Sequence, residues 1–196
     1  MTARSLFVAG THTDVGKTHV ACALIDAARA SGLSVDAFKP VVSGLDPEDW
    51  AGSDPGRLLT ALGRDLTPEA LEAVAPRRFR APLSPPMAAR LEGRRLELGE
   101  VEGDCRAWLE VSTADLRIIE GVGGLMSPVS EVATGLDLMA ALAIPAVLVA
   151  GGYLGSISHT LTALAAAREA GVAIACVVVS QDGDPGAPDF LESIAD

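Results

Sequence analysis

A short segment near the N-terminus, GTHTDVGKT at residues 10–18, constrains the fold more than any other feature of the chain. It follows the apolar run at residues 6–9 and precedes a helical pattern of apolar residues from Lys17 to Ala30. A strand that feeds a glycine-containing loop and then a helix is typical of a phosphate-binding loop, in which backbone N–H groups and the helix N-terminus converge on phosphate oxygens. The segment therefore predicts a nucleoside triphosphate site.

Two side chains of this loop can supply the chemistry of such a site. Lys17 can reach the β- and γ-phosphates, and the Thr18 hydroxyl can ligate Mg²⁺. The spacing departs from the strict motif, because five residues separate Gly10 from Gly16. A glycine-containing turn with an incidental lysine is the alternative, but the strand, the GKT triplet and the helix all favour the phosphate loop. The residues expected to contact the nucleotide here are Asp14, Val15, Gly16, Lys17, Thr18 and His19.

The rest of the chain alternates between strand and helix patterns. Apolar runs predict strands at residues 34–38, 115–119, 146–150 and 172–179, whereas periodic patterns predict helices at 54–62, 67–74, 98–111, 136–142 and 157–170. A proline-rich segment at 81–86 can start a further helix through Arg90, and residues 39–55 read as a loop. This alternation predicts an α/β fold, a doubly wound and mostly parallel sheet with helices on both faces. The length is within that of one domain, residues 1–196.

Composition excludes several classes of function. A formal net charge of −11 disfavours binding to nucleic acid or to an anionic membrane surface. The longest apolar stretch, residues 136–149, is interrupted by Asp137 and Pro145, so no membrane span is expected. The three cysteines lack metal or disulfide spacing, and the N-terminus lacks a signal-peptide pattern, so a cytoplasmic protein is expected.

Three charged residues fall where predicted strands or loops end. Lys39 follows the second strand; a lone lysine there is usually a solvated surface residue, but a neighbouring phosphate loop favours a role on a transferring phosphoryl group. Asp54 can be either a carboxylate of the first helical turn or a Mg²⁺ ligand. Glu120 ends a hydrophobic strand and is followed by Gly-Val-Gly-Gly, so it is the stronger metal candidate. Thr18, Asp54 and Glu120 together form a plausible set of oxygen ligands for Mg²⁺.

Other polar residues carry weaker signals. The histidines at positions 12, 19 and 159 share no metal-ligand spacing and are expected to be surface residues. No serine lies in a nucleophile elbow, so acyl-enzyme chemistry is not indicated.

Six motifs occur in a fixed order: GTHTDVGKT at 10–18, KPVVSG at 39–44, GSD at 52–54, PLSPPMAA at 82–89, IIEGVGGLMSP at 118–128 and LGSISHTL at 154–161. Together they resemble dethiobiotin synthetase, an enzyme family of biotin biosynthesis. The resemblance covers residues 5–182. It implies a homodimer that uses ATP, Mg²⁺ and CO₂ to close the ureido ring of 7,8-diaminopelargonic acid.

The resemblance also implies roles for individual residues. One amine of the diamine takes up CO₂ as a carbamate, the carbamate oxygen attacks the γ-phosphate, and the second amine expels phosphate from the mixed anhydride. Lys17 and Lys39 would be catalytic, because both stabilise charge at the transferring phosphoryl group. Substrate contacts are implied for Thr13 and Ser43 and, from the opposite subunit, for Gly155, Ser156 and Ser158. Nucleotide contacts are implied for Asp54, Glu120, Gly121, Val122, Gly123, Ser180 and Gln181.

The chain departs from the family pattern at three positions. Ser158 and Ser180 stand where the family commonly has asparagine, and Pro86 stands where it has histidine. Ser180 is expected to weaken a contact to adenine. The family also commonly continues beyond residue 196 with a segment that packs near the base.

Three other functions fit part of the pattern. Partner-switch ATPases of the same broad fold share the GKT triplet but carry a second lysine where His12 stands. Cobyrinate-type synthetases have a similar loop but need an additional glutaminase domain, for which the chain has no room. A non-catalytic nucleotide-binding module is the third alternative.

Overall fold

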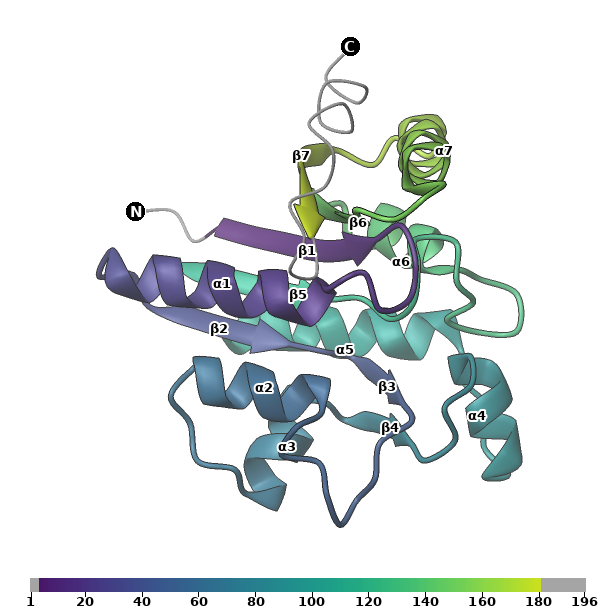
Figure 1. Cartoon of the computed structure of the whole chain (residues 1–196). Helices are drawn as coiled ribbons and strands as arrows, with labels where there is room; N and C mark the ends of the chain where they lie inside the picture. Colours follow the sequence, from purple (N-terminus) through teal and green to yellow (C-terminus); the bar gives the residue numbers. More distant parts are fainter. Residues whose placement is uncertain (1–3, 181–196) are drawn as a thin grey trace.

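The main sheet has five parallel strands. The computed structural model describes residues 4–180. The strands are β1 (Arg4–Gly10), β2 (Val35–Phe38), β5 (Leu116–Glu120), β6 (Ala146–Gly151) and β7 (Ile174–Ser180), in the order β2-β5-β1-β6-β7 (Figure 1). Because the first strand lies between β5 and β6, the loops after β1 and β5 leave the same edge of the sheet side by side.

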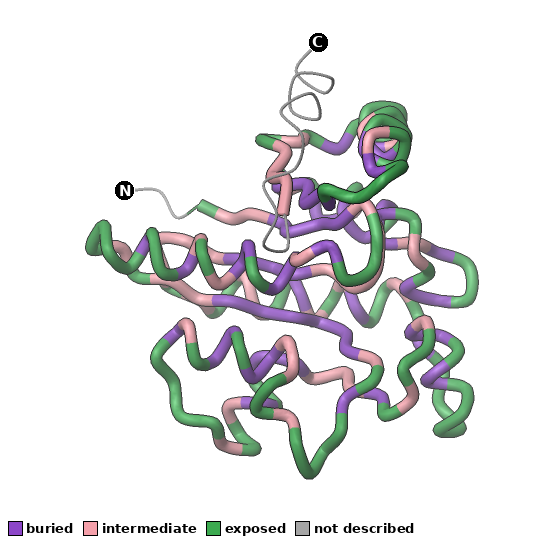
Figure 2. Tube along the Cα trace, viewed as in Figure 1, coloured by how far each residue is buried: buried purple, intermediate pink, exposed green. Residues whose placement is uncertain are grey.

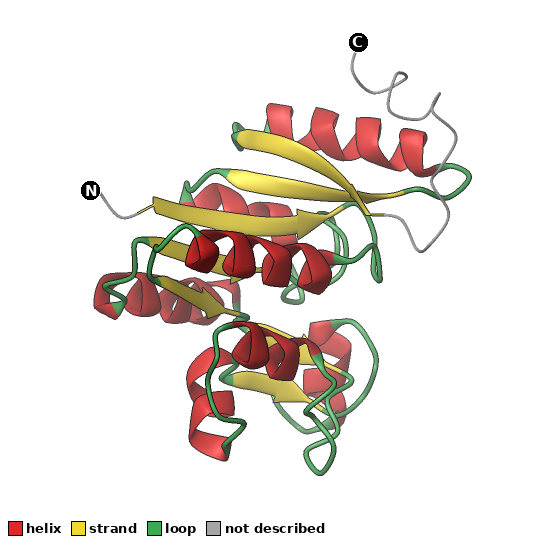
Figure 3. Ribbon diagram, turned by 60° about the vertical axis from the view of Figure 1, so that its left-hand side comes forward, coloured by secondary structure: helices red, strands yellow, loops and turns green. Residues whose placement is uncertain are grey.

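Helices cover both faces of this sheet (Figure 3). Successive side chains of a strand point to opposite faces. Val8 and Ile118 therefore pack with α1 (Lys17–Ala30), whereas Phe7 and Ile119 belong to a second core with the remaining large helices. Those helices are α5 (Leu98–Val111), α6 (Gly135–Leu142) and α7 (Ser156–Glu169). The predicted doubly wound α/β fold is confirmed.

A second, two-stranded sheet lies beside the carboxyl ends of the main strands. It consists of β3 (Val41–Ser43) and β4 (Arg77–Phe79), which pair in parallel, with α2 (Asp54–Ala61), α3 (Pro68–Val74) and α4 (Pro85–Leu91) around them. The prediction of an uninterrupted loop at residues 39–55 is therefore wrong, and β4 was not predicted. Strands of three residues are too short to show a periodic signal.

The other predicted elements agree with the structure to within two residues at each end. The central strands are buried while the outer faces of the helices are exposed (Figure 2). Within residues 4–180, none of the helices has the length and apolar character needed to cross a lipid bilayer.

Candidate active site

The phosphate loop connects β1 to α1 in the conformation that such a loop requires. Gly16, the residue before α1, has φ 91°, in the left-handed region that glycine adopts without strain. A Cβ at this position would collide with the side chain of Ser180, so the end of β7 lies directly against the loop. Lys17 folds back over the loop, with its Nζ 3.4 Å from the carbonyl oxygen of His12. Burial, followed by the nearby Lys39 ammonium, lowers the pKa of Lys17.

Four side chains from four separate segments form a charged cluster beside the loop: Thr18, Lys39, Asp54 and Glu120. The Thr18 hydroxyl lies 2.7 Å from Asp54 Oδ1 and 2.7 Å from Glu120 Oε1. Lys39 Nζ lies 2.5 Å from Glu120 Oε1 and 2.8 Å from Asp54 Oδ2. A hydroxyl has one proton, so Thr18 cannot donate fully to both carboxylates. The cluster thus gathers more acceptor oxygens than its own donors satisfy.

Burial makes the ion pairs in this cluster strong. Lys39 is 2% exposed and Glu120 is 1% exposed, so the alternative of Lys39 as a solvated surface lysine is wrong. Burial alone would lower the pKa of Lys39, but the Glu120 and Asp54 carboxylates outweigh it and raise that pKa. Burial alone would likewise raise the pKa of Asp54, which Lys39 and the Thr18 hydroxyl hold below its ordinary value. Lys39 is therefore a cation and Asp54 an anion at neutral pH.

The carboxylates are suited to hold a divalent cation. Glu120 Oε2 is buried and has no hydrogen-bond partner among residues 4–180, although buried carboxylate oxygens are normally paired. Asp54 is the first residue of α2, but its carboxylate contacts Thr18 and Lys39 across the cluster instead of capping its own helix. Carboxylate and hydroxyl oxygens are the ligands that Mg²⁺ prefers.

The glycine loop that follows β5, residues 121–124, contacts both this cluster and the phosphate loop. The carbonyl oxygen of Gly121 accepts a hydrogen bond from Lys39 Nζ at 3.3 Å. A Cβ on Gly123 would lie 3.7 Å from Thr13 Oγ1, and one on Gly124 would lie 3.0 Å from the carbonyl oxygen of Thr11. The loop therefore needs small residues to approach the phosphate loop. Val122, between these glycines, is half-buried.

The turn that opens α7 also borders the phosphate loop, within the same chain. The imidazole of His159 stacks on that of His12, with ring centroids 6.0 Å apart, and the Tyr153 hydroxyl lies 2.8 Å from His159 Nδ1. No pattern in the sequence predicts these contacts, although all three histidines are exposed as expected. The predicted substrate residues of this turn differ: Gly155 precedes the helix with φ 92°, Ser158 is exposed, and Ser156 is fully buried.

Two other predicted residues, Ser43 and Ser180, lie outside the charged cluster. Ser43 ends β3 and is half-buried, opposite Phe79 of β4. Ser180 ends β7 against Gly16, as described above. Gln181 lies outside the described residues. The exposed residues Asp14 and His19 flank the buried Val15, Lys17 and Thr18 along the loop and the first turn of α1.

A parallel sheet with a phosphate loop after its first strand, and with a carboxylate at the end of the neighbouring strand, defines a P-loop nucleotide-binding protein. Solved structures share this fold. A ParA family ATPase from Chlorobium tepidum TLS aligns with a TM-score of 0.53 at 14% identity, covering 99% of this chain and 82% of that one. Chloroplast FtsY from Physcomitrella patens aligns with a TM-score of 0.53 at 17% identity, covering 100% and 55%.

Sequence comparisons narrow the class to one family. The model of a family described as AAA domain matches residues 4–196. The ATP-dependent dethiobiotin synthetase BioD of Caulobacter vibrioides is 59% identical over 97% of this chain and 85% of its own length. The protein of the same name from Methylobacterium nodulans is 47% identical over 98% and 86%. The chain belongs to the ATP-dependent dethiobiotin synthetase family.

Proposed function

We propose that the chain, with residues 1–196 acting as one nucleotide-binding catalytic domain, converts 7,8-diaminopelargonic acid, CO₂ and ATP into dethiobiotin, ADP and phosphate. The observation that carries the proposal is the convergence of two lysines and two carboxylates on the phosphate loop. Lys39 lies within ion-pair distance of both Asp54 and Glu120, and Lys17 lies close enough for Lys39 to lower its pKa. The relatives named above support the choice of substrate.

The two lysines are the groups that stabilise charge during the reaction. The attacking carbamate and the leaving ADP are both negatively charged, so negative charge gathers around the γ-phosphoryl group. Ammonium groups fixed beforehand around that locus stabilise the transition state without reorganising. Lys17 acts from the phosphate-loop side and Lys39 from the end of β2. Burial of Lys39 excludes water from this contact and strengthens it.

Three bond-forming steps complete the reaction. One amine of the diamine attacks CO₂ and loses a proton, which gives a carbamate. A carbamate oxygen attacks the γ-phosphorus and ADP leaves, which gives a carbamic–phosphoric anhydride. The second amine then attacks the carbonyl carbon and loses a proton, phosphate leaves, and the five-membered ureido ring closes. Thr13 and Ser43 contact the diamine, while Gly121, Val122 and Gly123 face it and the phosphates.

Thr18, Asp54 and Glu120 would hold Mg²⁺. Two observations support this assignment: Glu120 Oε2 has no hydrogen-bond partner in the part of the chain that the structure describes, and the single proton of the Thr18 hydroxyl lies between two carboxylates. When bound there, the cation supplies neutralising charge to the phosphate oxygens.

We further propose a homodimer with a shared substrate site, in which the turn at residues 155–158 binds the substrate carboxylate of the opposite subunit through a helix N-terminus. A Lys39→Gln protein mixed with a variant carrying changes at 155–158 forms heterodimers with one intact site. Random exchange should restore about one quarter of wild-type turnover. Absence of any recovery, once mass spectrometry verifies exchange, would exclude the shared site.

The protein is proposed to act in the cytoplasm on small molecules. The free cysteines Cys22, Cys105 and Cys176 suit a reducing compartment. The test of the overall function is phosphate release from ATP with the diamine and bicarbonate together, compared with either alone, with dethiobiotin detected by mass spectrometry. Phosphate release that requires both substrates supports the proposal. Phosphate release at the same rate with and without the diamine would indicate a partner-switch ATPase instead.

A further inference from the structure

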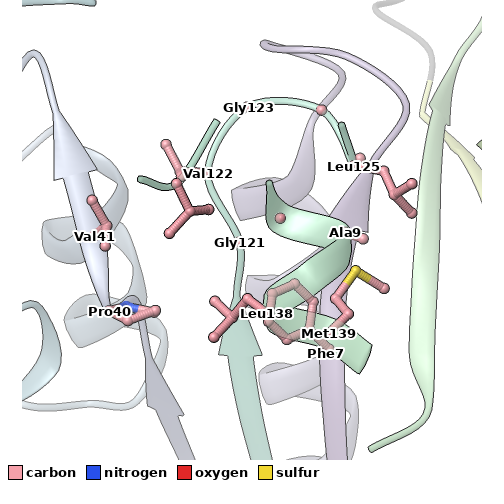
Figure 4. A pocket seen from close by; sticks show the side chains of 14 residues that line it. Phe7, Ala9, Pro40, Val41, Gly121, Val122, Gly123, Leu125, Leu138 and Met139 are labelled. Atoms are coloured by element: carbon pink, nitrogen blue, oxygen red, sulfur yellow. The ribbon is translucent and has the colours of Figure 1, made fainter. Parts of the chain in front are cut away.

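An apolar pocket lies beneath the loop that follows β5, on the face of the sheet opposite to Glu120. Its walls are apolar side chains and glycine backbone alone, among them Phe7, Val41, Leu138 and Met139 (Figure 4). The cavity that these walls enclose has a volume of about 20 Å³. A volume of that order holds one group of the size of water or methyl. None of the side chains that line the pocket is charged.

The pocket is adjacent to the reacting groups. Gly121, which lines it, accepts a hydrogen bond from Lys39 Nζ at 3.3 Å. Pro40, another wall, directly follows Lys39 in the chain, and Gly10 begins the phosphate loop. The walls from α6 are almost fully buried, whereas the loop residues 121–124 are half-buried. The glycine loop is therefore the least buried wall of the pocket, and it is also the wall that contacts Lys39 and the phosphate loop.

The next step rests on the proposed function. The diamine carries its two amines on neighbouring carbons, one of which bears a terminal methyl and the other a long chain that ends in a carboxylate. The two amines are otherwise nearly equivalent, so an enzyme must distinguish them by what flanks them. We infer that the pocket binds the terminal methyl of the diamine and thereby fixes which amine faces the phosphate loop.

Size and polarity both exclude the other arm from this pocket. The chain is far longer than the space available, and its carboxylate would lose hydration without gaining a partner. A methyl fits, and an apolar pocket distinguishes one methylene by about tenfold to two-hundredfold. Binding of the methyl thus selects one orientation of the diamine.

The experiment compares kcat/KM for three substrates: 7,8-diaminopelargonate, 7,8-diaminooctanoate, which lacks the methyl, and 7,8-diaminodecanoate, which carries an ethyl group. Wild-type protein should favour diaminopelargonate over each of the others by about tenfold or more. Met139→Ala enlarges the pocket, so it should raise the ratio of kcat/KM for diaminodecanoate to that for diaminopelargonate by about tenfold. Leu142→Ala is the matched control, because Leu142 is buried in the same core on the same helix but does not line the pocket.

The outcomes separate the two proposals. If the wild-type protein forms no dethiobiotin from diaminopelargonate, the proposed function fails. If it does, but treats the three substrates alike, or if Met139→Ala and Leu142→Ala shift the ratio equally, the pocket does not bind the methyl. Should Met139→Ala not fold, Met139→Val takes its place with the same expected direction. Ratios of kcat/KM are independent of the fraction of folded protein, so partial destabilisation does not affect the result.

Discussion

The two faces of one strand end differ sharply in this protein. At the end of β5, Glu120 points to the α1 side and joins buried charges, whereas Gly121 and Val122 border an apolar pocket on the α6 side. Side-chain alternation along a strand is sufficient to separate the two environments by a single residue. The groups proposed to stabilise phosphoryl transfer and the pocket proposed to bind the substrate methyl can therefore share one loop, because they lie on different faces of the same sheet.

The largest expected effect is on the charged face of the sheet, which carries Lys17 and the cluster of Thr18, Lys39, Asp54 and Glu120. Lys39→Gln removes a buried ammonium fixed beside the transferring phosphoryl group, so turnover should fall by about 10²–10³-fold, equivalent to about 3–4 kcal/mol. Lys17→Gln should have an effect of similar size. Steady-state phosphate release at saturating substrates measures both. Arg95→Gln is the control, because Arg95 is exposed and its nearest carboxylate oxygen lies 3.9 Å away. Near-normal turnover in Lys39→Gln would remove this lysine from the mechanism.

A second comparison distinguishes the two carboxylates. Glu120→Gln leaves buried Lys39 with Asp54 as its one remaining ion-pair partner among the described residues, so the free energy of unfolding should fall by about 1–3 kcal/mol. Asp54→Asn should cost less than about 1 kcal/mol, because the Asp54 side chain is 44% exposed. Both variants should need more Mg²⁺ for half-maximal activity. Urea unfolding and Mg²⁺ titration test this pair, and unchanged Mg²⁺ dependence in either variant would leave that carboxylate with a structural role alone.

The sequence predicted most of the charged face, and the reason is topological. Loops after neighbouring parallel strands leave the same sheet edge, so placing Lys39 and Glu120 at strand ends also placed them near the phosphate loop. Their burial could not be predicted, because it depends on α2 and on the loop after β5, which approach from distant parts of the chain. Thr18 and Asp54 were predicted as members of one ligand set, but the direct hydrogen bond between them was not, because no local pattern connects the two positions.

The apolar face was not predicted at all. Its walls come from β1, the start of β3, the glycine loop and α6, and each segment by itself resembles ordinary core. A pocket is a small deficit in packing, and no residue type signals it. The β3–β4 pair and the stacking of His159 on His12 were missed for a related reason, since both depend on tertiary contacts between short segments.

A smaller effect on the charged face should appear in acid. Asp54 has a pKa below 3.8 in the folded protein, so between the folded and unfolded values the unfolded chain binds more protons and stability rises with pH. The contribution of Asp54 to stability is complete above the pKa that this carboxyl has in the unfolded chain. It is lost as pH falls through the lower pKa of the folded protein. Thermal unfolding from about pH 5 to about pH 2.5 should therefore show a shallower decline in Asp54→Asn than in wild type. Parallel curves would mean that the carboxylate gains nothing from Lys39.

A further expected effect concerns the choice of nucleobase and depends on Ser180, at the end of β7. Ser180 lies against Gly16, and its single hydroxyl can form one hydrogen bond at a time in each direction, whereas an amide can donate to N7 and accept from the N6 amino group of adenine together. A site without this pair of hydrogen bonds binds the nucleotide mainly by stacking on the base and by contacts to the phosphates. We expect CTP and GTP to be used within about tenfold of ATP in kcat/KM, equivalent to about 1.4 kcal/mol. Ser180→Asn should widen the preference for ATP, and a wild-type preference above about a thousandfold would point to adenine contacts from residues other than Ser180.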